Sequence, residues 1–360
     1  MKKIAIILED MRIGGPQKQL IYFLQQTIKK KTNHRYLIIA PKNSKNEFSK
    51  FFDLKKIEII ELDIQYLSAY SIVNYIKSFF LDFNVLSNCF RNIEKIYIAG
   101  GSSNLKSLLV SAILKKKIYF HIHDTKSNFF IKFTLLVLSR FIKKIFFASK
   151  FSKDYYSFLN AKPKKIVLRS SVNTSEFKIR KKRKKDFKVG IIANINPDKN
   201  LELLIEIIDN INDKDIKFEL IGNLFSSQKK YFIKNLSKIN KLQHKLKWKK
   251  NIFHPKKDMK NFDILISTSY QESLPLSIIE ALSMSIPVIS TNVGDVAYVL
   301  KKNKCGFIVN PEISEYIDII KMLKLNKKKL LKYSSNARKN ILNNFNIKDY
   351  HKKMEKELFL

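Results

Sequence analysis

The chain contains only two cysteines, Cys89 and Cys305, in 360 residues. They lie far apart and have no metal-ligand spacing around them, which excludes a disulfide framework and a cysteine-based zinc site. A reducing cytoplasm is the compartment that this cysteine usage predicts.

Long apolar runs are also missing. The apolar stretch Ile4–Leu8 stops at Glu9 and Asp10, too soon for the core of a secretory signal peptide. The longest apolar region, residues 129–147, is interrupted by lysines and an arginine, so it does not meet the length that a membrane span requires. We therefore expect a protein that is soluble or attached peripherally to a membrane.

Acidic residues are few: the chain has 31 Asp and Glu and 69 Lys and Arg, which gives a formal net charge of +38. A charge of this size suggests an anionic partner, either nucleic acid or an anionic membrane surface. The excess is nearly all lysine, is spread over the whole length and accompanies heavy use of Ile, Asn and Phe. A general bias of the coding sequence is therefore an alternative explanation.

Short apolar runs alternate with longer amphipathic ones, which predicts an α/β protein with parallel strands and helices on both faces of each sheet. In the first half the expected strands are Ile4–Leu8, Tyr36–Ile39, Ile57–Leu62, Ile96–Ala99, Ile118–His121, Ile145–Ala148 and Ile166–Leu168. In the second half they are Lys188–Ile192, Lys217–Ile221, Leu246–Trp248, Asp263–Ser267, Val288–Ser290 and Phe307–Val309. The expected helices include Gln17–Lys30, Ser71–Phe90, Leu105–Leu114, Asn128–Phe141, Ser152–Leu159 and Ile347–Leu360.

A highly charged segment separates the two halves. We expect a first domain over residues 1–175, a basic linker over 176–187 and a second domain over 188–347. The linker lacks the interleaved aromatics of a nucleic-acid patch, so nucleic acid is not an expected partner. Two similar α/β halves imply a ligand cleft between them.

One stretch of the second half, Tyr270–Ala281, combines a strand end, a turn and a helix start. A helix beginning near Pro275 or Leu276 would point the backbone amides of Leu276 and Ser277 at an anion such as a diphosphate. Glu272 precedes that helix and Glu280 lies just inside it, and carboxylates accept paired hydrogen bonds from vicinal hydroxyls. The alternative is that Glu280 is only an acid favoured by the helix dipole and Glu272 a solvated loop residue.

Three other loops follow predicted strands. Gly14 and Gly15 let the backbone approach another molecule, but the spacing is not that of a dinucleotide fingerprint. His121 and His123 share one face of a strand, and His123, at its carboxyl end, is better placed for a cleft; a buried, hydrogen-bonded core histidine is the alternative for either. With only Asp124 nearby, metal binding is not expected. Lys199 follows the first strand of the second half, where a lysine can neutralise a phosphate, although a solvated lysine is the alternative.

These segments together resemble retaining nucleotide-sugar glycosyltransferases of the GT-B fold, specifically glycosyltransferase family four. The strongest match is residues 270–291, with two glutamates flanking seven residues, a helix of small residues and a Pro-Val-Ile strand. Other segments follow in the family's order: Gly14-Gly15, His123-Asp124, residues 148–152, 170–177 and 194–199, Val293-Gly294-Asp295, and residues 306–309.

The resemblance implies two Rossmann-like α/β/α domains facing a cleft, with the last helix, residues 348–360, returning to the first domain. It implies that Glu280 binds ribose hydroxyls, Glu272 the sugar hydroxyls and Lys199 the diphosphate, helped by Gly14, Gly15, Leu276 and Ser277. His123 would contact the transferred sugar. No metal, cofactor or protein nucleophile is implied.

Three positions depart from the family pattern. Asn194 stands where the family usually has an arginine, so one of two phosphate-neutralising cations is absent or supplied elsewhere. Asp295 and Tyr298 replace a glycine and a glutamate, and Ser170-Ser171 replace an Asn-Gly turn.

The implied partners are a nucleotide diphosphate sugar and a growing, lipid-linked glycan of a bacterial surface polysaccharide, such as lipopolysaccharide or capsule. Family members often work at the inner membrane face. Lysines 115–117, Phe129-Phe130 and Lys143-Lys144 are consistent with an interfacial surface, or with solvated helix faces. Two other functions remain open: a nucleotide-sugar epimerase of the same fold, and a non-enzymatic basic protein that binds membrane or nucleic acid.

Overall fold

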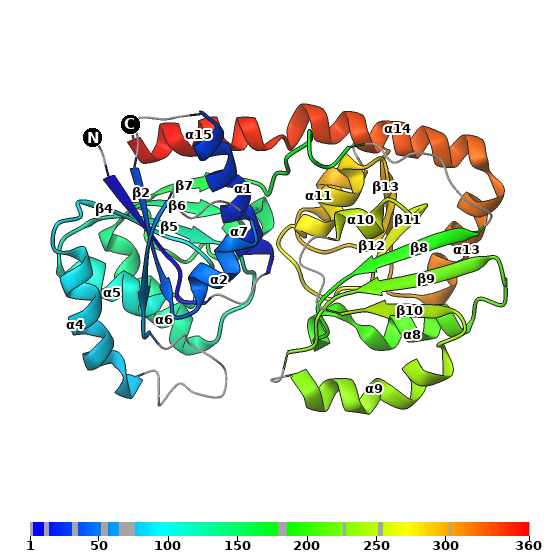
Figure 1. Ribbon diagram of the computed structural model, residues 1–360, viewed down its shortest axis with the longest axis horizontal. Coiled ribbons are helices and arrows are strands. Elements are labelled where there is room, and N and C mark those ends of the chain that lie inside the picture. The colour runs from blue at the N-terminus through cyan, green and yellow to red at the C-terminus, as the bar shows by residue number, and fades with distance from the viewer. Residues whose placement is uncertain are drawn as a thin grey trace. The chain divides into compact units, whose positions relative to one another are not determined.

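The computed structural model describes residues 3–10, 14–30, 35–51, 57–64, 76–178, 186–225, 228–250, 255–301 and 304–359. The chain forms two compact units, Met1–Ser170 with Ile347–Leu360, and Ser171–Asn346 (Figure 1). Most of the expected linker, residues 179–185, lies outside the described residues.

Within the described residues, unit 1 contains a parallel sheet of seven strands in the order β3-β2-β1-β4-β5-β6-β7. Its strands are β1 (Lys3–Ile7), β2 (Arg35–Pro41), β3 (Glu58–Leu62), β4 (Lys95–Ile98), β5 (Lys117–Ile122), β6 (Ile142–Phe147) and β7 (Lys164–Val167). All seven were predicted from short apolar runs, which are typical of parallel strands in a sheet with helices on both faces.

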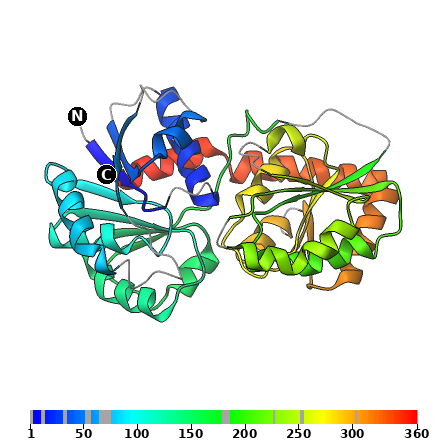
Figure 2. The ribbon, with the colours of Figure 1, turned by 60° about the horizontal axis from the view of Figure 1, so that its bottom comes forward.

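Two groups of helices cover this sheet (Figures 1 and 2). Ala5, Ile98 and Phe120 face a core completed by α4 (Phe79–Phe90), α5 (Leu105–Ile113), α6 (Phe129–Leu138) and α7 (Lys150–Tyr155). On the other side, α1 (Gly15–Lys30) packs against α15 (Ile347–Phe359), the predicted last helix. The short helices α2 (Ser44–Ser49) and η2 (Ser139–Phe141) also belong to the described part of the unit.

Within the described residues, unit 2 contains a parallel sheet of six strands in the order β10-β9-β8-β11-β12-β13. The strands are β8 (Phe187–Ile192), β9 (Ile216–Ile221), β10 (Leu246–Lys249), β11 (Ile264–Ser267), β12 (Val288–Thr291) and β13 (Gly306–Val309). The predicted strands are confirmed here too. Strand β11 pairs with β8, Leu265 lying opposite Gly190, so the loops that follow these two strands are neighbours.

The helices of unit 2 also form two layers. Helices α8 (Leu201–Asp209), α9 (Lys229–Lys241) and α13 (Ile313–Leu325) bury one core against the sheet. On the other face α11 (Leu276–Ser283) packs on α14 (Lys327–Asn344). The described residues of this unit also form the short helices η3 (Pro197–Lys199), α10 (Lys256–Met259) and α12 (Val296–Leu300).

Some predicted boundaries were wrong. The helix expected over Ser152–Leu159 is α7, which begins two residues earlier and ends at Tyr155. It begins there because the Ser149 hydroxyl accepts a hydrogen bond from the Ser152 amide at 2.9 Å and so caps the first turn. The helix expected over Ser71–Phe90 is α4, and residues 71–75 of that range lie outside the described residues.

Candidate active site

Lys199 and Glu272 form an ion pair in unit 2. The Lys199 ammonium contacts Glu272 Oε1, and the Ser269 hydroxyl donates to the same oxygen at 3.2 Å. The two side chains are 25% and 17% exposed, so the pair is partly buried but open to a ligand. Lys199 and Glu272 are therefore in direct contact although they are 73 positions apart in the sequence. Both were predicted to bind the sugar donor.

Backbone hydrogen bonds hold the two loops of this pair together. The Tyr270 amide donates to the Asp198 carbonyl at 2.8 Å, and the Thr268 hydroxyl donates to the Lys199 carbonyl at 2.9 Å. The loop after β8 and the loop after β11 are thus tied by groups that do not titrate. The ion pair keeps its place without depending on the attraction between its own charges.

A third loop supports Glu272 from the other side. Gly294 has φ +50°, and a Cβ atom at this position would overlap with the backbone carbonyl oxygens of Glu272 and Ser273. The next residue, Asp295, donates its amide hydrogen to the Ser273 carbonyl at 2.9 Å. Only glycine fits this approach, so Gly294 controls where Glu272 lies.

Helix α11 begins at Leu276, as predicted. The Leu276 and Ser277 amides lie in its first turn, where backbone amides have no acceptor within their own helix. Glu280 is buried at 1% exposure and has a partner within the protein. Glu280 and Glu272 thus differ in environment: one carboxylate is buried in α11 and the other is paired in an open loop.

Asn194 ties two strand ends together. Its side-chain oxygen accepts a hydrogen bond from the Asn223 amide at 3.0 Å, and the Ile195 amide donates to the Asn223 carbonyl at 2.9 Å. Asn194 also lines a small pocket with Lys199 and Ser269. In this pocket Asn194 is therefore a neutral neighbour of Lys199. The hydrogen bond between Asn194 and Asn223 had no signal in the sequence.

The two histidines of unit 1 are stacked. The rings of His121 and His123 lie with centroids 3.9 Å apart, which confirms that they share a strand face. His121 is fully buried and shares a 2.6 Å hydrogen bond with the Tyr97 hydroxyl. His123 follows β5 and is less buried, and desolvation by burial lowers its pKa to about 3. His123 is therefore a neutral ring at physiological pH.

Asp124 holds the loop beside His123. Its carboxylate accepts hydrogen bonds from the Ser102 amide at 2.7 Å and from the Tyr156 hydroxyl. The Ser152 hydroxyl donates to the Asp124 carbonyl at 2.7 Å. Sequence reasoning missed Tyr97, Ser102 and Tyr156; only Ser152, in the Ser149-x-x-Ser152 capping pattern, had a visible signal.

The glycine turn of unit 1 lies where β1 leads to α1. The Gly14 amide donates to the Gln17 side chain at 3.2 Å, and Gln17 donates in turn to the Asp10 carbonyl at 3.0 Å. A Cβ atom at Gly15 would meet no atom of the described residues within 4 Å. Within the described part of the chain the backbone of Gly15 is therefore uncovered on this side, as the prediction of a close approach to a ligand requires.

Among the described residues, no group of three or more His, Cys, Asp or Glu could hold a metal ion. No helix of the described residues has the length and hydropathy needed to cross a membrane.

The environment of His123 makes a testable prediction about pH. Between the ordinary histidine pKa near 6.5 and about 3, the unfolded chain binds a proton that folded His123 does not. The contribution of His123 to stability is therefore complete above about pH 6.5 and is lost progressively as the pH falls toward 3. We expect His123→Gln to reduce the loss of unfolding free energy between pH 7 and pH 4, measured by urea denaturation. An unchanged pH dependence would contradict this environment for His123.

Comparisons with known proteins agree with the fold. Residues 172–340 match the family model described as glycosyl transferases group 1. A poly(ribitol-phosphate) alpha-N-acetylglucosaminyltransferase of Staphylococcus aureus is 30% identical over 164 residues, 44% of this chain and 32% of that protein. The O-antigen biosynthesis glycosyltransferase WclY of Escherichia coli is 26% identical over 197 residues, 52% of this chain and 54% of that protein. The alignments thus span about a third to a half of these relatives.

Solved structures match over nearly the whole chain. Anabaena HepE in complex with UDP and glucose gives a TM-score of 0.83 at 17% identity, covering 99% of both chains. TarM gives a TM-score of 0.78 at 15% identity, covering 100% of this chain and 99% of its own. At these identities the likeness concerns the fold. The protein has the two-sheet architecture of GT-B glycosyltransferases, and most of its second unit matches the glycosyl transferases group 1 model.

Proposed function

We propose that this chain is a retaining, metal-independent glycosyltransferase of family four. It would transfer a sugar from a nucleotide diphosphate sugar to a growing, lipid-linked glycan in the biosynthesis of a bacterial surface polysaccharide. The observation that carries the proposal is the Lys199–Glu272 pair, tied to the loop that leads into the N-terminus of α11. The relatives named for O-antigen and poly(ribitol-phosphate) glycosylation support the choice of pathway.

The chemistry follows from the charges. A donor diphosphate takes the place of Glu272 beside Lys199 and accepts hydrogen bonds from the Leu276 and Ser277 amides. Glu272, released from the lysine, accepts hydrogen bonds from the sugar hydroxyls, and Glu280 from the ribose. His123, as a neutral ring, contacts the transferred sugar.

In the transfer step the bond between the sugar C1 and the diphosphate oxygen breaks. The acceptor hydroxyl oxygen bonds to C1 from the same face and passes its proton to the departing diphosphate. Lys199 and the helix amides stabilise the charge that develops on the leaving group. No protein nucleophile and no metal take part, so chelation by EDTA should leave turnover unchanged.

A cytoplasmic location and an anionic membrane surface as partner are parts of this proposal. Nucleic acid has no role in it.

The first test is a thermal-shift screen with UDP, GDP, ADP and dTDP sugars. At a hundredfold excess over its Kd, a bound donor contributes about 2.7 kcal/mol and should raise the Tm by roughly 5–10 °C. One nucleotide class should dominate, which also identifies the donor. No shift with any member would contradict the proposal, and formation of an epimerised nucleotide sugar without acceptor would identify an epimerase instead.

A further inference from the structure

The outer face of α6 is apolar and exposed. Phe129 is 83% exposed, and the same face carries other exposed apolar side chains: Phe133, Leu136, Val137 and Phe141, the last just beyond the helix. The opposite face of the helix is buried on the sheet through Ile131, Leu135 and Leu138. A contiguous exposed apolar face of this kind indicates a binding partner.

Helix α4 adds a second apolar face on the same side of the sheet (Figures 1 and 2). Phe80 and Leu81 are 77% and 74% exposed, and Val85 lies one turn further along. Helix α5 packs against both α4 and α6. The acid of α4, Asp82, is turned inward to a buried ion pair with Lys106, so it does not interrupt the apolar face.

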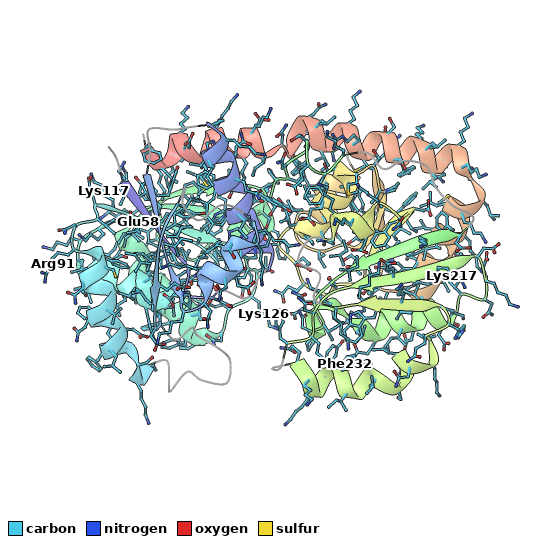
Figure 3. All side chains as sticks on the ribbon, viewed as in Figure 1. Glu58, Arg91, Lys117, Lys126, Lys217 and Phe232 are labelled. Carbon is cyan, nitrogen blue, oxygen red and sulfur yellow. The ribbon has the colours of Figure 1, made fainter. Side chains whose placement is uncertain are left out.

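Cations surround these apolar side chains. Lys132 and Arg140 are exposed on the outer side of α6 and the turn after it, and Lys115 is exposed just after α5. Lys117, two residues further on, is paired with Glu94. Arg91, Lys117 and Lys126 show how widely basic side chains are spread over this unit (Figure 3). Asp124 is the single acid between Lys95 and Lys150, and it already accepts hydrogen bonds from Ser102 and Tyr156. The partner must therefore be anionic as well as apolar.

These requirements select one occupant. A second copy of this chain would bring two basic surfaces together, which is electrostatically unfavourable. A bilayer that contains anionic lipids offers acyl chains for phenylalanine and phosphates for lysine and arginine. We propose that the outer faces of α4 and α6 dock the chain onto an anionic lipid bilayer, with Phe80, Phe129 and Phe133 inserted at the interface.

This inference rests on the membrane contact in the proposed function and names the side chains that make it. It uses none of the residues assigned to the donor. Vesicle binding and sugar transfer to a water-soluble acceptor can therefore fail independently of each other.

The test is flotation of the full chain with two kinds of vesicle. One contains phosphatidylcholine alone, and the other contains about 30 mol% phosphatidylglycerol, which makes the vesicle surface anionic. Wild type should float with the anionic vesicles and not with the neutral ones. Phe129→Ser with Phe133→Ser should weaken partitioning at least roughly tenfold. Lys132→Glu with Arg140→Glu should weaken it roughly 25-fold or more, and more strongly at low salt.

Two control variants match these changes. Leu325→Ser removes an apolar side chain that is 82% exposed in unit 2, nearly the exposure of Phe129. Lys327→Glu with Lys328→Glu changes the net charge by the same amount at exposed positions of α14. Both controls should bind anionic vesicles about as well as wild type.

Several outcomes would overturn the proposal. They are failure of wild type to float, equal binding to neutral vesicles, or loss of binding in the α14 control as large as in Lys132→Glu with Arg140→Glu. Light scattering that shows a wild-type dimer and a monomeric Phe129→Ser, Phe133→Ser variant would assign the surface to a second copy. Far-UV circular dichroism and Tm values confirm that each variant is folded.

Discussion

Replacing Lys199 with alanine is expected to lower kcat/KM by about 10²–10³-fold, the loss that follows removal of one preorganised group from a developing negative charge. The Lys199 ammonium is in contact with Glu272 in a partly buried site, so the variant also leaves that carboxylate without its partner. The affinity for the nucleoside diphosphate alone should fall by at least roughly tenfold, because the charge-assisted contact to phosphate is lost. Steady-state kinetics and calorimetric titration measure the two effects.

Glu272→Gln separates the roles of the two partners. Glutamine keeps the shape but does not hold Lys199 by charge, so affinity for the nucleoside diphosphate should be equal to that of wild type or tighter. Turnover should still fall severely, since the sugar hydroxyls lose a carboxylate acceptor. Full activity in both Lys199→Ala and Glu272→Gln would rule out the assignment of this site.

Lys249→Ala is the matched control for Lys199→Ala. Lys249 is also 25% exposed in unit 2, and it pairs with Glu219 and Asp258. Its replacement should lower stability by about 1–3 kcal/mol, the effect expected when paired acids lose a partner, and leave kcat/KM nearly unchanged. Equal losses of activity in both lysine variants would indicate general destabilisation instead of a donor contact.

Replacing Gly294 with alanine should both destabilise unit 2 and displace Glu272. The new Cβ would overlap with the carbonyl oxygens of Glu272 and Ser273, at a backbone conformation that L side chains rarely adopt. We expect a loss of about 2–4 kcal/mol in unfolding free energy. A shift of about 1 Å in Glu272 should lower kcat about 10²-fold even at temperatures where the variant is folded.

Gly306→Ala provides the comparison for Gly294→Ala. Its Cβ would overlap with the Val288 carbonyl oxygen in the strand pair β12–β13, and no carbonyl of the Glu272 loop is among its nearest atoms. It should lose about 1–3 kcal/mol of stability and keep wild-type kcat below its Tm. If the two variants lose stability and kcat in the same proportion, Gly294 has no special effect on the site.

The strands and the start of α11 could be predicted because each depends on local sequence. A parallel strand buried on both faces is a short apolar run, and Pro275 before Leu276 marks a helix start. The stacking of His121 on His123 also followed from the alternation of side chains along a strand. These features need only the residues immediately around them.

The contacts that build the site could not be predicted in this way. Lys199 meets Glu272 because β8 and β11 are neighbours in a sheet whose order differs from the order of the chain. The hydrogen bond from Tyr156 to Asp124 likewise joins the loop after β5 to the end of α7. Asn194 was noted for the charge that it lacks, whereas its contact with Asn223 depends on the pairing of β8 with β9.

The central claim is that a nucleotide diphosphate sugar binds at the carboxyl ends of β8 and β11 and at the start of α11. Hydrogen exchange followed by mass spectrometry, with and without the nucleotide found in the thermal screen, tests it most directly. The claim predicts slower exchange in residues 194–200 and 268–280, and loss of this protection in Lys199→Ala. Protection confined to other segments, or the same protection in Lys199→Ala as in wild type, would contradict it.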